Sequence, residues 1–126
     1  MIETGLKSFL TSAATSAAGR IYPLVLPQAP VLPAMTYQRV SGNRVKSLSG
    51  PSGLAHPRFQ IDCWGATYNE AKTLAQEVRR VIDGYRGQMG SIRVGGAIVL
   101  SDRDIHEPEA EDYRVTIDVT IWHDET

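Results

Sequence analysis

The chain of 126 residues has a single cysteine, Cys63, so it forms no internal disulfide and lacks the thiolates of a structural zinc site. No apolar run approaches the roughly 18 residues that an ordinary membrane helix needs. The N-terminus also lacks the basic start and apolar block of a signal peptide. We therefore expect a protein that is made and kept in a cytoplasm and that has no membrane partner.

A strong net charge is missing as well. The formal net charge is −1, and the 13 lysines and arginines are scattered rather than gathered in a basic stripe. This pattern disfavours direct nucleic-acid binding, because nucleic-acid-binding domains usually concentrate positive charge on one face. The hydrophobic fraction of 42% is ordinary for a folded protein. At this length we expect a single domain over residues 1–126.

The sequence carries no catalytic, phosphate-binding or metal-binding motif. It contains no GxSxG elbow, Walker loop or GxGxxG loop, and the acidic stretch lacks the ligand rhythm of an EF-hand. His56, His106 and His123 are far apart in the sequence. Cys63 falls on the apolar side of a strand, where a free cysteine usually acts as a small hydrophobic residue. We expect neither an enzyme nor a cofactor or metal site.

Two segments have the periodicity of amphipathic helices. Apolar residues recur at helical spacing over residues 2–17 and again, more clearly, over residues 68–85. Thr67 followed by Glu70 fits a capping box at the start of the second helix. Residues 20–33 contain four prolines and are expected to form an extended connector.

Four segments are expected to be strands: residues 34–41, 58–65, 91–100 and 113–123. The second and fourth alternate apolar and polar residues, which is typical of half-buried strands. Gly95-Gly96 suggests a bulge or bend in the third. The element order predicts an α+β fold of the type α-β-β-α-β-β, with a four-stranded, mainly antiparallel sheet and both helices packed on one face.

Two connections differ in charge. Residues 34–57 are read as a strand followed by a long mobile loop, which carries Arg44 and Lys46 and no acidic residue. Residues 101–112 are read as an acidic loop with six acidic residues and one arginine. Opposite charges on two surfaces would fix the register between neighbouring copies of the chain. Two independent solvated loops explain the same pattern equally well.

Trp64 and Trp122 lie near strand ends. Each is either ordinary edge packing or an interface anchor, since exposed tryptophan is enriched in binding hot spots. The candidate interface residues are therefore Arg44, Lys46, Trp64, Asp102, Asp104, Glu107, Glu109 and Trp122.

Several segments in the same order resemble the tail-completion proteins of long-tailed phages, also described as tail-to-head joining or tail-terminator proteins. The resemblance covers nearly the whole chain. No single piece is a catalytic signature, and its specificity comes from order and spacing. The segments are GRIYP at 19–23, LPQAPVLPAMTYQRVSG at 26–42, GPSGLAHPRFQIDCWG at 50–65, TYNEAKTLAQEVRRVIDGYRG at 67–87 and DRDIHEPEAEDYRVTIDVTIWH at 102–123.

The resemblance implies a small non-enzymatic subunit that forms a ring, often a hexamer. The ring would cap the growing tail tube, stop its polymerisation and offer a surface to the head connector. The implied partners are other copies of the chain, the tail tube protein and the head–tail connector proteins. The implied location is the virion tail or neck, after assembly in the cytoplasm of the bacterial host. The alternatives are another neck component, such as a stopper or adaptor, a cellular ligand-binding α+β domain, or a small hydrolase.

Overall fold

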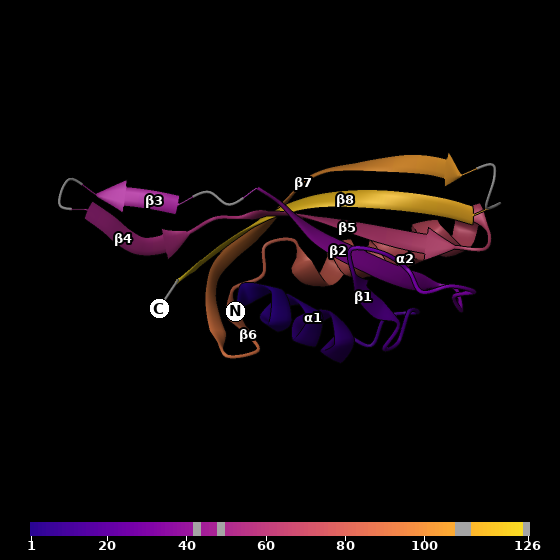
Figure 1. Ribbon diagram of the computed structural model, residues 1–126, viewed down its shortest axis with the longest axis horizontal. Coiled ribbons are helices and arrows are strands. Elements are labelled where there is room, and N and C mark those ends of the chain that lie inside the picture. Colours follow the sequence, from indigo (N-terminus) through magenta and orange to yellow (C-terminus); the bar gives the residue numbers. More distant parts are fainter. Residues whose placement is uncertain (42–43, 48–49, 108–111, 125–126) are drawn as a thin grey trace.

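The computed structural model describes residues 1–41, 44–47, 50–107 and 112–124 (Figure 1). Within these residues lie two helices, α1 (Ile2–Ser12) and α2 (Tyr68–Ile82). The strands are β1 (Ile21–Pro23), β2 (Ala34–Ser41), β3 (Arg44–Ser47), β4 (Gly50–Ala55), β5 (Arg58–Gly65), β6 (Gly87–Met89), β7 (Ile92–Glu107) and β8 (Asp112–Asp124).

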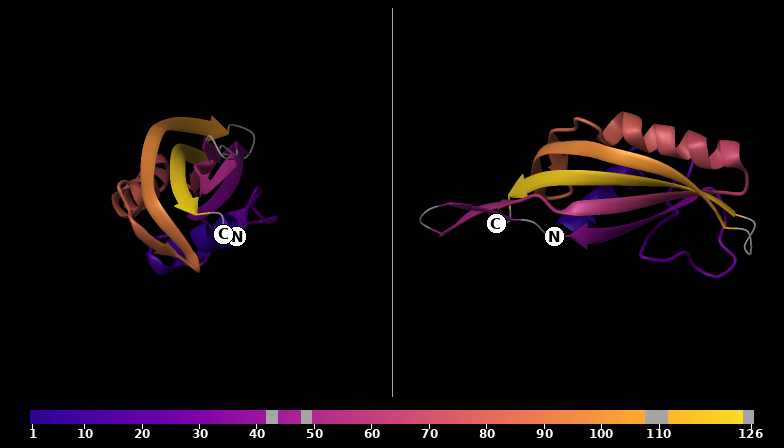
Figure 2. Two further views of the ribbon diagram at one scale, coloured as in Figure 1. Left: turned by 90° about the vertical axis from the view of Figure 1, so that its left-hand side faces the viewer. Right: turned by 90° about the horizontal axis from the view of Figure 1, so that it is seen from above.

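The strands form one curled sheet. Its body has six strands in the order β1-β2-β5-β8-β7-β6, and the β3–β4 hairpin joins it through the end of β8. Among the strands that the structure describes, only the β1–β2 pair is parallel. Figure 2 shows the sheet curling strongly into a half-barrel. The α+β class and the mainly antiparallel pairing are confirmed, but the prediction of four strands is wrong. The two added body strands, β1 and β6, have three residues each, which is too short for an alternating pattern to be visible.

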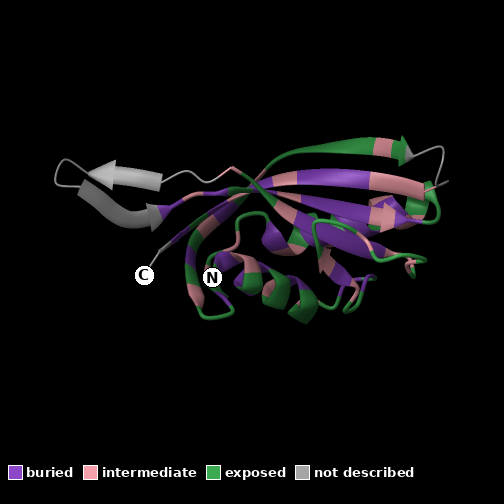
Figure 3. Ribbon diagram, in the orientation of Figure 1, coloured by how far each residue is buried: buried purple, intermediate pink, exposed green. Residues whose placement is uncertain are grey.

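A single hydrophobic core lies on one face of this sheet. Alternate residues of β5 and β8 are fully or almost fully buried there, as the period-2 pattern predicted (Figure 3). Leu6 and Leu10 of α1 and Leu74 and Val78 of α2 belong to the same buried cluster. Both helices therefore cover one face, and the polar residues of β5 and β8 point to the other.

The helix starts were predicted better than the helix ends. The Thr67 hydroxyl accepts a 3.1 Å hydrogen bond from the Glu70 amide, which confirms Thr67 as the cap of α2. However, α2 ends at Ile82 rather than at residue 85, and α1 ends at Ser12 rather than at residue 17. Beyond Ser12 the chain must turn toward β1, and Ala14 and Ala18 have left-handed φ angles of 54° and 52°, which no helix accommodates.

The segment predicted as a loop over residues 41–57 contains the β3–β4 hairpin, which we call the arm (residues 44–55). The arm projects beyond the body of the molecule (Figure 1). Its strands form because they pair with each other and because Leu54 and Ala55 continue the ladder of β8. That long-range pairing leaves no periodic signal in such a Gly- and Ser-rich sequence.

The acidic segment is also mostly strand. β7 runs on to Glu107 and β8 begins at Asp112, so only residues 108–111 separate them, and these lie outside the described residues. Pairing along β8 explains why acidic residues of low strand propensity are extended here. The predicted bulge at Gly95-Gly96 is confirmed by a register shift between Val94 and Gly96.

Candidate interface surfaces

The helix-free face of the sheet carries a polar cluster centred on Asp62. Its carboxylate accepts hydrogen bonds from Thr116 (2.8 Å), Gln60 (3.1 Å) and Thr36 (3.5 Å), and one oxygen lies 3.7 Å from the Arg114 guanidinium. The Asp62 side chain is only 9% exposed. A buried carboxylate needs such partners, because burial without them is costly. This cluster is therefore a structural element within one chain.

Trp64 belongs to the polar cluster. Its indole nitrogen donates a 3.0 Å hydrogen bond to the Thr36 hydroxyl. The Arg114 guanidinium carbon lies 4.9 Å from the centre of the ring, in a cation–π arrangement. The geometry thus gives Trp64 an intramolecular role, which corresponds to the edge-packing interpretation. An additional role for Trp64 at an interface stays a prediction.

Trp122 has a different environment. It is 39% exposed and lies opposite Gly96, which has no side chain to cover the indole. His56, directly after the arm, stacks on the ring with centroids 4.2 Å apart. Ile98 is 51% exposed on the neighbouring strand. An exposed indole beside an exposed isoleucine and the root of the arm is the kind of surface that anchors a protein partner.

Asp102 and Asp104, the acidic residues of the candidate interface whose side chains the structure describes, both contact α2. An Asp102 oxygen lies 2.7 Å from the Arg79 guanidinium. Asp104 accepts hydrogen bonds from the Tyr68 hydroxyl (2.8 Å) and from Lys72 (3.1 Å). The Tyr68 hydrogen bond first, and the Lys72 contact second, hold the pKa of Asp104 below its ordinary value.

These contacts fasten β7 to α2. The Asp104 hydrogen bond in turn raises the pKa of Lys72. Near the C-terminal end of α2, the Asp83 carboxylate accepts from the Val99 amide at 3.0 Å, and the Gly84 amide donates to the Ala97 carbonyl at 2.7 Å. The acidic residues at 102 and 104 therefore have basic partners in their own chain. Whether they also meet a neighbouring copy stays a prediction.

The remaining predicted residues are distributed over both ends of β8. Arg44 and Lys46 lie on β3, and the structure describes their backbone only. Glu107 is the last residue of β7, while Glu109 lies outside the described residues. The arm meets β8 at His123 and Asp124, whereas Glu107 pairs with Asp112 at the other end of that strand. One copy therefore does not bring the basic and acidic segments together.

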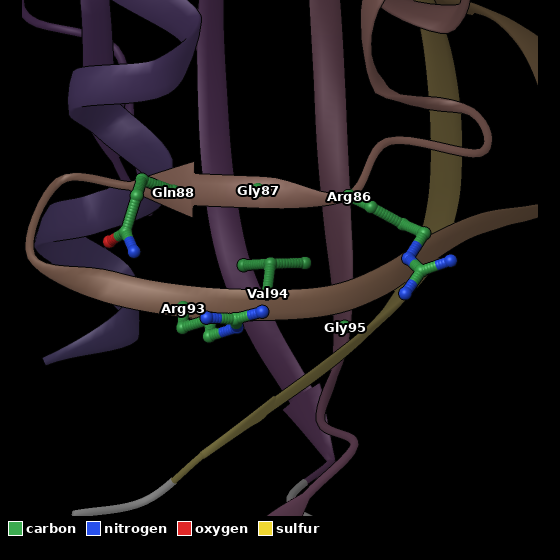
Figure 4. Close-up of a pocket in the computed structure, with 6 residues that line it drawn as sticks. All are labelled: Arg86, Gly87, Gln88, Arg93, Val94 and Gly95. Atoms are coloured by element: carbon green, nitrogen blue, oxygen red, sulfur yellow. The ribbon is translucent and has the colours of Figure 1, made fainter.

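A basic pocket was missed by the sequence reasoning. Arg86, Gln88 and Arg93 line it together with Gly87, Val94 and Gly95, and its volume is about 380 Å³ (Figure 4). Neither arginine forms an ion pair with another described residue. The available signal was the short Gly-Gln-Met-Gly stretch at 87–90, which is a turn pattern with an arginine on each side.

No three histidine, cysteine, aspartate or glutamate residues in the described part of the chain are placed to hold a metal ion. No helix there is long and apolar enough to cross a membrane.

Comparison with solved structures shows a similar fold in a chain of the virion of a native gene transfer agent particle. The TM-score is 0.70 at 16% sequence identity, covering 98% of this chain and 91% of the other. A comparison with curated protein sequences gives no match. The family described as tail completion protein gp17 matches residues 7–124. The chain therefore belongs to the tail completion protein gp17 family, whose members are non-enzymatic structural components of a phage-like virion.

Proposed function

We propose that this protein forms a ring, a hexamer in the simplest case, at the head-proximal end of the tail tube. There it stops growth of the tube and joins the tail to the head. Its partners are other copies of itself, the tail tube protein and the head–tail connector proteins. Family membership supports the tail-completion role. The fold shared with a chain of a gene transfer agent virion is consistent with a place in an assembled particle.

The observation that carries the ring is the arm. In the part of the arm that the structure describes, two residue pairs join it to the sheet body, Leu54 with Asp124 and Ala55 with His123. A two-stranded hairpin is at best marginally stable in water unless something packs against it. The exposed Trp122 lies at its root, stacked on His56. A neighbouring subunit that packs against the arm would stabilise the hairpin, and the same subunit could cover the exposed Trp122 ring.

Such a contact joins two different surfaces of identical chains. The arm end of one copy would meet another region of the next copy, which is a heterologous contact. Repeated contacts of this kind close into a ring when the rotation per subunit divides a full turn. Many weak contacts around a ring also add up to a stable assembly, because each later contact forms at high effective concentration.

The experiment is deletion of the gene followed by negative-stain electron microscopy of the particles. Overlong tails would support tail termination, and normal heads beside unattached tails would support joining. Complementation with the intact gene should restore normal particles. A variant with residues 44–53 replaced by a two-residue turn should fold, as judged by circular dichroism, yet fail to complement. Normal infectious particles from the deletion would disprove the proposed function.

A further inference from the structure

We propose that the basic pocket formed by Arg86, Gln88 and Arg93 binds the acidic end of the β7–β8 hairpin of a second copy of this chain. We define the acidic end by Glu107 and Asp112. The inference rests on the proposed ring and adds to it one pair of contact surfaces. It commits to a protein carboxylate as the ligand of the pocket.

The pocket suits carboxylates. A guanidinium group presents several donors in a planar fork that matches a carboxylate, and two such groups line one hollow here, with the Gln88 side chain beside them (Figure 4). Arg86 and Arg93 are exposed, and neither is paired with an acidic residue in the described part of the chain. Their charges are therefore available to a partner.

The pocket is also held in shape. Gln88 pairs with Arg93 and Gly87 with Val94 across the β6–β7 hairpin. The Tyr85 hydroxyl donates a 2.6 Å hydrogen bond to the Gln88 carbonyl. Val94 is buried in the core beneath the hairpin. Because the backbone is fixed in this way, little ordering of the backbone is needed when a ligand binds.

The acidic end is opposite in charge to the basic pocket. Glu107 and Asp112 occupy directly opposed positions in the β7–β8 ladder. Both residues are acidic, so this end of the hairpin carries two formal negative charges at opposed positions of the ladder. Asp112 forms no ion pair with another described residue, in contrast to Asp102 and Asp104, which pair with α2.

Geometry requires the contact to be between copies. Val94, in the basic pocket, pairs with His123, whereas Glu107 pairs with Asp112 at the opposite end of β8. At about 3.3 Å per residue, the two sites are separated by roughly 36 Å along a strand in the middle of the sheet. Figure 1 shows β6 and the C-terminal end of β7 toward opposite ends of the molecule. One copy cannot close on itself, so the contact is between copies, and it joins two different surfaces as the heterologous contact of a ring does.

The test is complementation of the deletion with charge-reversed variants. We expect Arg86→Glu/Arg93→Glu to lose tail completion down to the level of the deletion, and Glu107→Lys/Asp112→Lys to do the same. The chain that combines all four substitutions should regain tail completion, because both surfaces are then reversed together. The matched control is Lys7→Glu/Arg80→Glu, two exposed cations outside the pocket with the same change in net charge. This control should complement as well as the unaltered gene.

A second readout is covalent. Arg93→Cys combined with Asp112→Cys should form disulfide-linked dimers and higher multimers in assembled particles, whereas either substitution alone should not form multimers. The native Cys63 is fully buried and does not interfere. Circular dichroism of each variant identifies any that fails to fold.

The outcomes separate the two proposals. If Arg86→Glu/Arg93→Glu completes tails normally while the deletion does not, the pocket contact is disproved and the proposed function stands. If the combined variant folds but is not rescued and no cross-link forms, the pocket binds some other acidic partner, and the inference is overturned. If the deletion itself gives normal particles, the proposed function fails first.

Discussion

The Thr116 hydroxyl donates a 2.8 Å hydrogen bond to the Asp62 carboxylate, and the two residues lie directly opposite each other on β8 and β5. Both are almost completely buried, although they lie on the sheet face that has no helix. A charged group in this position is tolerated because neighbouring side chains satisfy it. The polar face of the central strands is thus a packed layer rather than an open surface.

We predict that Asp62→Ala lowers the free energy of unfolding by about 2–3 kcal/mol, because it removes several hydrogen bonds to a buried charged group. Urea denaturation followed by fluorescence measures the loss. Asp118→Ala on β8 is the control: Asp118 is only half-buried and accepts a 3.2 Å hydrogen bond from Ser101, so its loss should be about 1 kcal/mol or less. Equal losses for the two variants would contradict the central role of Asp62.

The two tryptophans should separate stability from assembly. We predict that Trp64→Ala lowers the free energy of unfolding by about 3 kcal/mol, since the ring packs within the polar cluster. Trp122→Ala should cost about 1 kcal/mol, because its ring is substantially exposed. Complementation of the gene deletion should give the opposite result. Trp122→Ala should fail to restore normal particles, whereas the milder variant Trp64→Phe, which keeps most of the ring packing, should restore them. A fully functional Trp122→Ala variant would remove Trp122 from the interface.

Local features of the fold were accessible from the sequence. Strands β5 and β8 and the start of α2 follow from short-range signals, namely alternation and a Thr67–Glu70 cap. The arm, β1, β6 and the extension of β7 depend instead on pairing with strands that no alternating pattern of their own indicates. β1, for example, is a strand because Ile21 and Tyr22 pair with Met35 and Thr36. No local pattern reports such a partner.

The same division applies to the candidate interface. Trp122 shares the phase of the polar residues of its strand, so its exposure followed from alternation. That Gly96 lies opposite it, with no side chain to cover the indole, could not be predicted. The ion pairs of Asp102 and Asp104 with α2 form only because this helix packs along β7. Arg86 and Arg93 line one pocket only because the β6–β7 hairpin is formed. The number of charged residues in a segment therefore could not show which of them form ion pairs within the chain and which do not.

Cys63 should make stability fall at alkaline pH. Burial, with smaller contributions from Asp62 and Glu77, raises the pKa of the Cys63 thiol well above its ordinary value of 9.0. Below about pH 9 the thiol is protonated in both states and contributes no pH dependence. Above it the unfolded thiol ionises and the native one does not, so unfolding becomes easier by up to about 1.4 kcal/mol per pH unit.

The measurement is denaturation at several pH values from 8 upward, with Cys63→Ala as the control. Cys63→Ala should be less stable at neutral pH, because it leaves a cavity, but its stability should decline less steeply with rising pH. The native thiol should also react with a thiol reagent only when the chain unfolds. Parallel curves for the two proteins, or rapid labelling of the native protein, would show that the thiol is accessible.

Gly5 is required where α1 crosses β6. A Cβ atom at this position would lie 2.3 Å from the Met89 carbonyl oxygen, which is backbone and cannot rotate away. In an open helix, Gly→Ala gains about 1 kcal/mol; here we predict that Gly5→Ala instead destabilises the protein by about 1–3 kcal/mol, because α1 must move off β6. Gly19→Ala is the control, since nothing lies within 4 Å of its added Cβ atom. Thermal and urea denaturation of both variants measure the difference, and a Gly5→Ala protein more stable than the unaltered chain would show that α1 is free to shift.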